Sequence, residues 1–84
     1  MPATVSVQTI ELDCPPGNPR PGDLIGSVLE GTDLKAGEPD SMFFGCWVWS
    51  FKMSDEDWEK KIQPVIQPRI EALYHSGAIR YGSW

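Results

Sequence analysis

The side chains that could do chemistry are few and scattered. His75 is the only histidine in the chain, and Cys14 and Cys46 lie far apart with no Cys-x-x-Cys or histidine neighbourhood. Acid–base catalysis and metal sites both need such groups close together. We therefore expect no metal site, no cofactor and no enzymatic activity, and we expect both cysteines to be free thiols.

The other candidates for chemistry are acid pairs and glycines in the first half of the chain. Glu11 with Asp13, or Glu38 with Asp40, could serve as acid and base, although acid pairs in a solvated loop are common without any such role. The glycines match neither G-x-G-x-x-G nor G-x-x-x-x-G-K-S/T, so no phosphate loop is present. A small enzyme or enzyme subunit with an aromatic-lined pocket stays open as an alternative.

The chain is acidic, with a formal net charge of −5, and the acidity belongs to its first half. Residues 1–40 contain seven acids against Arg20 and Lys35, while residues 41–84 balance five acids with five bases. Nucleic acids and anionic membranes attract clustered lysine and arginine, so we expect neither as a partner. The first residues lack the charged and apolar regions of a signal peptide, which predicts a cytoplasmic protein.

Residues 42–52, MFFGCWVWSFK, are the most distinctive of the elements that must position these side chains. One parity carries Phe43, Gly45, Trp47, Trp49 and Phe51, and the other carries Phe44, Cys46, Val48 and Ser50. Because both faces are apolar, the segment predicts a single central strand that is covered on both sides.

Residues 54–76 predict a long amphipathic helix. Ser54 can cap its first turn by accepting a hydrogen bond from the Asp57 amide, and Gly77 is suited to end it. Pro64 and Pro68 lie on the solvent side, so we expect one continuous helix kinked at proline; two helices broken at residues 63–64 are the alternative. One apolar stripe faces the core: Trp58, Ile62, Val65, Ile66, Ile70, Ala72 and Leu73.

The remaining segments complete a small α+β domain that spans residues 1–84. Residues 1–13 predict a first strand, 14–41 a Gly/Pro-rich acidic loop with a short helix at 23–30, and 78–84 a last strand. In the first strand either a β-bulge near residues 8–9 or a change of partner must explain why the apolar parity switches between Val7 and Ile10. The fold class is a sheet of about three mostly antiparallel strands packed against the C-terminal helix.

Arg69 falls within the apolar stripe of the helix, where a charge is costly unless it is paired. One interpretation is an arginine that lies over aromatic rings or pairs with an acid of its own chain. The other is an anchor that points into an interface, because arginine and tryptophan are enriched among binding hot spots.

A sheet of this size offers one face more than its single good helix can cover. We expect the open face to form a large aromatic patch, unless residues 15–40 fold across it. The sequence thus favours a small acidic protein-binding or assembly module, with a homodimer or another protein as partner; an inhibitor or accessory factor of the phage or mobile-element type is an alternative. The predicted contact residues are Phe43, Trp47, Trp49, Arg69, Arg80 and Trp84.

Overall fold

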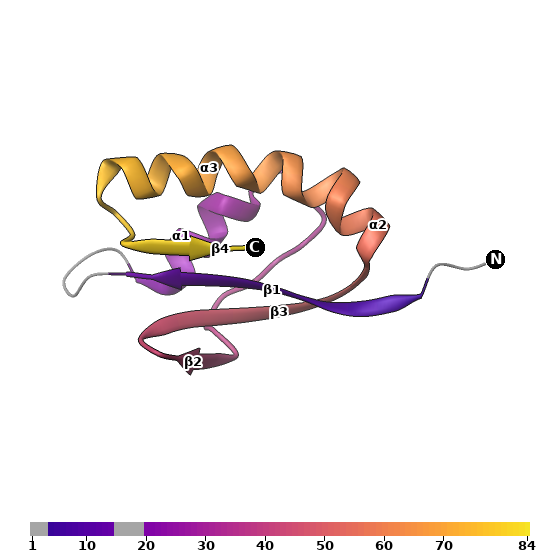
Figure 1. Ribbon diagram of the computed structural model, residues 1–84, viewed down its shortest axis with the longest axis horizontal. Helices are drawn as coiled ribbons and strands as arrows, with labels where there is room; N and C mark the ends of the chain where they lie inside the picture. The colour runs from indigo at the N-terminus through magenta and orange to yellow at the C-terminus, as the bar shows by residue number, and fades with distance from the viewer. Residues whose placement is uncertain (1–3, 15–19) are drawn as a thin grey trace.

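The computed structural model describes residues 4–14 and 20–84. The two long strands, β1 (Val5–Asp13) and β3 (Cys46–Ser54), pair antiparallel along most of their length. The short strands β2 (Ser41–Phe43) and β4 (Tyr81–Ser83) form the two edges, in the order β2-β3-β1-β4 (Figure 1). Every pairing is antiparallel, which confirms the predicted α+β class.

The sheet has four strands because the predicted strand 42–52 is divided into two. Phe44 and Gly45 form a two-residue loop between β2 and β3, with φ values of 50° and 80°. Two positive φ values match a type I′ turn, whose twist suits the strands that flank a tight hairpin. The single strand was therefore wrong at its start: Ser41–Phe43 fold back onto the beginning of β3.

β1 contains no bulge within its pairing to β3, so the predicted bulge near residues 8–9 is wrong. The register runs without a break from Val5 opposite Ser54 to Leu12 opposite Trp47. Successive side chains therefore alternate between faces. Ile10 and Leu12 are buried on one face, whereas Val5 and Val7 lie on the other and are 64% and 65% exposed.

The predicted short helix is present as α1 (Pro21–Leu29), which starts earlier than residue 23. Pro21 suits the first helical position, because its missing amide would have no partner there in any case. Gly31, with φ of 83°, follows the last turn and permits the left-handed conformation that ends the helix.

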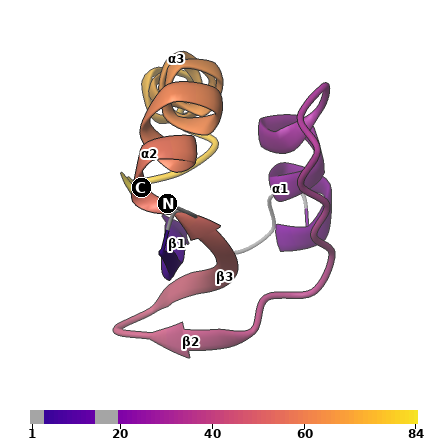
Figure 2. The same cartoon turned by 90° about the vertical axis from the view of Figure 1, so that its right-hand side faces the viewer.

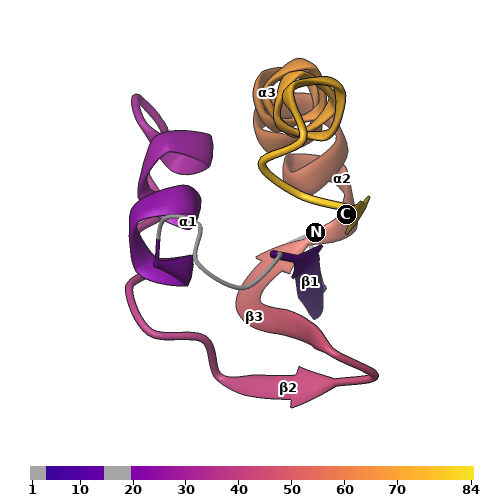
Figure 3. The same cartoon turned by 90° about the vertical axis from the view of Figure 1, so that its left-hand side faces the viewer.

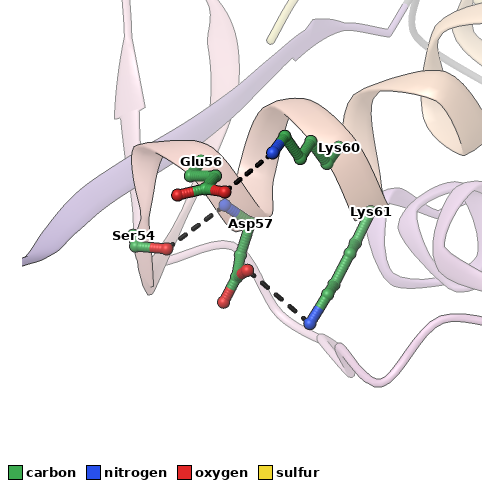
Figure 4. A network of polar contacts seen from close by, with 5 residues as sticks. All are labelled: Ser54, Glu56, Asp57, Lys60 and Lys61. Atoms are coloured by element: carbon green, nitrogen blue, oxygen red, sulfur yellow. Dashed lines mark hydrogen bonds and ion pairs between the residues drawn. The ribbon is translucent and has the colours of Figure 1, made fainter. Parts of the chain in front are cut away.

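The C-terminal helix is continuous from residue 55 to residue 76, which confirms the prediction of one continuous helix and not the alternative of two helices broken at residues 63–64. It comprises α2 (Asp55–Asp57), the wider π-helical turn η1 (Trp58–Ile62) and α3 (Gln63–Ser76). At its start the Ser54 hydroxyl oxygen accepts a hydrogen bond from the Asp57 backbone amide, with 3.2 Å between Oγ and N (Figure 4). Lys60 then pairs with Glu56 and Lys61 with Asp57, one turn further along (Figure 4). At its end Gly77 has φ of 85°, as expected.

The helix α1 and the C-terminal helix lie on the same face of the sheet. Figures 2 and 3 show α1 and α3 side by side on one side of the strands, with the other side left bare. The core lies between the strands and these two helices, and it joins side chains from every long element: Ile10, Leu12, Leu24, Ile25, Val28, Leu29, Trp49, Phe51, Trp58, Ile62, Ile66, Ile70 and Ile79. Residues 20–37, not a partner, thus cover the half of the sheet that α3 leaves free.

Among residues 4–14 and 20–84, no helix is both long and apolar enough to cross a membrane.

Candidate functional site

The aromatic face predicted to be open is buried. Trp49 is 1% exposed, and its indole Nε1 donates a hydrogen bond to the Gly37 carbonyl at 3.0 Å. Trp47 is half-buried and packs against the core. The parity that carries Trp47 and Trp49 faces α1 and α3, which corrects the expectation that this parity is solvent-facing. Of the predicted contact residues, Trp49 is therefore unable to reach a partner in the folded chain.

Arg69 binds within its own chain, at the end of α1. Its guanidinium Nη1 donates to the Val28 carbonyl at 3.1 Å and also to the Glu30 carbonyl. The last carbonyls of a helix lack intrahelical partners and carry the negative end of the helix dipole, so a cation there is stabilising. Arg69 thus links α3 to α1 through backbone oxygens, a partner that neither predicted interpretation named.

Arg80 and Trp84 meet in a shallow hollow between α3 and β4. Arg80 is paired with Asp13, its Nη2 lying 2.9 Å from the Asp13 carboxylate. Trp84 is half-buried against the core. The hollow has a volume of about 360 Å³ and is lined by Ile70, Glu71, Tyr74, Arg80, Tyr81, Gly82 and Trp84.

The largest exposed aromatic group lies at the β2–β3 hairpin. Met42, Phe43 and Phe44, which we call the hairpin tip, are 57%, 60% and 90% exposed. The rings of Phe43 and Phe44 contact each other edge to face, with centroids 4.4 Å apart. In Figures 2 and 3 the hairpin lies at the end of the sheet away from α3. Phe43 is the one predicted contact residue at this tip.

Phe44 occupies a backbone conformation that costs free energy. Its φ of 50° is the only positive value among the described residues other than glycine. For a bulky residue the left-handed region is an outlier, and asparagine or glycine is preferred at this place in a type I′ turn. Residues held in such conformations cluster at functional sites, where the strain serves the function.

Sequence reasoning missed Phe44 and Met42, although a signal was present. The glycine at position 45 interrupts an otherwise apolar run, and a glycine within a strand pattern can mark a turn. A turn at residues 44–45 would have placed the preceding phenylalanines at the end of a hairpin.

The remaining chemical groups are dispersed. The described residues include no cluster of three or more histidine, cysteine, aspartate or glutamate side chains that could hold a metal ion. His75 lies exposed on α3 beside Tyr74, with ring centroids 5.7 Å apart. Cys14 and Cys46 are both free, as expected.

Both cysteine thiols are shifted toward the neutral form. Burial raises the pKa of the Cys14 thiol, and the nearby Asp13 carboxylate adds to the effect. The pKa of the Cys46 thiol is also raised, first by burial and then by Asp13 and Glu11. A thiol with a raised pKa holds less of the reactive thiolate at neutral pH, so neither cysteine has the environment of a nucleophile.

Comparisons with protein-family models, with curated proteins and with solved structures give no match.

Proposed function

We propose that this chain is a small protein-binding module that contacts its partner through the hairpin tip. The observation that carries the proposal is Phe44, an aromatic side chain that is 90% exposed and held at a φ of 50°. Phenylalanine and methionine are enriched in protein interfaces relative to the rest of the protein surface. A turn selected for folding alone would carry asparagine before Gly45, because Asn-Gly is the preferred type I′ pair.

The geometry of the tip suits insertion into a partner. Phe44 projects from the two-residue turn, and Phe43 and Met42 project from opposite faces of the adjoining strand β2, so backbone pairing already orders the residues that would contact a partner. Methionine adapts its shape to irregular surfaces. The partner is a second copy of the chain or another protein, and an inhibitor or accessory role would use the same contact.

The test is the substitution Phe44→Asn. It creates the favoured Asn-Gly turn, so we expect the free energy of unfolding in urea to rise by about 1 kcal/mol, the lower end of the cost of a left-handed non-glycine residue. Association is expected to fall at the same time, because the most exposed aromatic ring is gone. If Phe44 is instead retained for stability alone, Phe44→Asn should lower the free energy of unfolding and leave association unchanged.

Association is measured in two ways, each with a matched control. Light scattering over a range of protein concentrations reports self-association, and titration calorimetry with a protein captured by the wild type and then purified reports a foreign partner. The control is Tyr74→Ser, which removes another exposed aromatic side chain from a distant surface. If Phe44→Asn associates as strongly as the wild type, the hairpin tip is not the contact.

A further inference from the structure

Within residues 4–14 and 20–84, one side of β1 has no paired strand over half of its length. β3 pairs with β1 from Val5 to Leu12, but β4 pairs only with Glu11, Leu12 and Asp13. Figure 1 shows β4 ending partway along β1. The side of residues 5–9 that faces away from β3 is therefore a free strand edge.

The backbone direction at this edge follows from the opposite side of the sheet. The Ser50 amide donates to the Asp40 carboxylate at 2.7 Å, so it points away from β1. Directly opposed residues in an antiparallel pair either exchange both backbone hydrogen bonds or turn both groups outward. Thr9 lies opposite Ser50, so Thr9 also turns its amide and carbonyl away from β3.

Val7 and Val5 repeat the orientation of Thr9, because backbone direction alternates along a strand. Outside the helices and strand ladders, the backbone hydrogen bonds among the described residues include none from residues 5–9. Three amides and three carbonyls in a row are thus available. Such an edge is a template for another extended segment.

A hollow of about 260 Å³ lies beside this edge. Two of its lining side chains are the exposed carboxylates Asp55 and Glu59, and none is lysine or arginine. The nearby bases Lys60 and Lys61 pair with Glu56 and Asp57 instead. The full lining is Val7, Gln8, Thr9, Asp55, Trp58, Glu59, Gln63 and Trp84.

We propose that the free edge of β1 from Val5 to Thr9 binds an extended segment of another protein, in which basic and apolar side chains alternate. Strand addition supplies the backbone hydrogen bonds, and alternate side chains of the added strand point to opposite faces. Basic side chains on one face meet Asp55 and Glu59. Apolar side chains on the other face lie next to Val5 and Val7, which are 64% and 65% exposed.

A second copy of the chain fits this edge less well than a basic partner. If two copies of β1 paired, Ser6 and Gln8 of one copy would face the hollow of the other, because these residues share the helix-side face of the strand. Neither carries a positive charge, so Asp55, whose carboxylate accepts a hydrogen bond from Gln8 of its own chain at 2.7 Å, and Glu59 would gain no cation. The site lies at the opposite end of β1 from the hairpin tip and does not depend on it (Figure 1).

The probe is a synthetic seven-residue peptide in which valine and lysine alternate, with a valine and glutamate peptide as its control. Both are titrated into the ¹⁵N-labelled protein. We expect the lysine peptide to shift the amide resonances of Val5, Val7 and Thr9 and to slow their hydrogen exchange, and we expect salt to weaken the effect. Equal binding of the two peptides, or no binding, would overturn the proposal.

Two variants separate the edge from the acids. Val7→Pro removes an amide that the β1–β3 ladder does not use, so we expect the fold to persist and affinity to fall by about tenfold, the effect of one lost hydrogen bond. Glu59→Lys should weaken binding, whereas Glu71→Lys, the same change elsewhere on the helix, should not. Unchanged affinity in Val7→Pro contradicts strand addition. Protection of the same amides without peptide, together with a dimeric mass, assigns the edge to self-association instead.

Discussion

Arg69 shows how a single residue on the apolar side of a helix can be satisfied by backbone alone. Its position on the helical wheel predicts that the charge needs a partner, and the partners are the Val28 and Glu30 carbonyls at the end of α1. Hydrogen bonds from a charged donor are stronger than neutral ones, and here they also satisfy carbonyls that α1 leaves open.

We expect Arg69→Ala to lower the free energy of unfolding by about 1–3 kcal/mol, because it removes charged hydrogen bonds and a favourable charge at a helix end. Arg69→Lys should restore part of the loss, since a single ammonium keeps the charge but not the fork of donors. Urea denaturation followed by circular dichroism measures both. If Arg69→Ala weakens association but leaves the free energy of unfolding unchanged, Arg69 contacts a partner instead of stabilising the fold.

The cysteines give a second prediction at the residue scale. Because burial raises the pKa of Cys14 and Cys46, both should react with a thiol reagent at pH 7.5 more slowly than free cysteine, and at the normal rate in denaturant. The same shift stabilises the fold fully below about pH 8.5, the ordinary thiol pKa, and the stabilisation is lost as pH rises through the folded-state pKa. Rapid labelling of the folded protein would contradict the burial.

At the scale of elements, the C-terminal helix remains continuous despite two prolines. Pro64 falls at the start of α3, directly after the wider turn η1, where the Gln63 amide bonds to the Trp58 carbonyl five residues back. The first helical turn tolerates proline because its amides have no partner within the element. Pro68 alone lies inside α3, on its exposed side.

The contact between α3 and β4 depends on the absence of a side chain at Gly82. A Cβ atom there would lie 2.6 Å from Ile70 Cγ2, in the core, so we expect Gly82→Ala to destabilise the protein by about 1–3 kcal/mol through overpacking. The control is Gly26→Ala in α1, where a Cβ meets nothing within 4 Å and the gain in helix propensity should stabilise by about 1 kcal/mol. Thermal unfolding of the two variants should therefore shift in opposite directions.

In the molecule as a whole, α1 and the C-terminal helix form one layer that covers a single face of the sheet. α1 is held there by buried leucine, isoleucine and valine side chains, and the Trp49 hydrogen bond to Gly37 holds the segment that follows α1. The opposite face carries Val5 and Val7 of β1, Lys52 of β3, Phe43 of β2 and Tyr81 of β4, so its two aromatic side chains lie on opposite edge strands. The surfaces left for partners are therefore edges and tips rather than a broad aromatic face.

This arrangement predicts how the four tryptophans respond to a quencher. Trp49 and Trp58 are 1% and 3% exposed, whereas Trp47 and Trp84 are half-buried. Acrylamide should therefore quench wild-type fluorescence only in part, and the double variant Trp47→Phe and Trp84→Phe should resist quenching more strongly. Complete quenching of that variant in the folded state would show that α1 does not cover the sheet.

The candidate site could be predicted only in part. The residue type of Phe43 predicts it as a contact residue, but the hairpin tip also requires the turn at Phe44. The apolar pattern of residues 42–52 does not reveal that turn, because it fits one continuous strand equally well. The prediction that Trp49 contacts a partner is wrong because periodicity shows which residues share a face but not which face is covered.

Local sequence signals predict the capped amphipathic helix, its end at Gly77 and the short helix before Gly31. These follow from side chains a few residues apart. The three-dimensional fold establishes the remaining features: α1 covers the aromatic face, Arg69 joins two helices, and β4 leaves half of β1 unpaired. Those outcomes depend on contacts between residues distant in the chain, which no local pattern encodes.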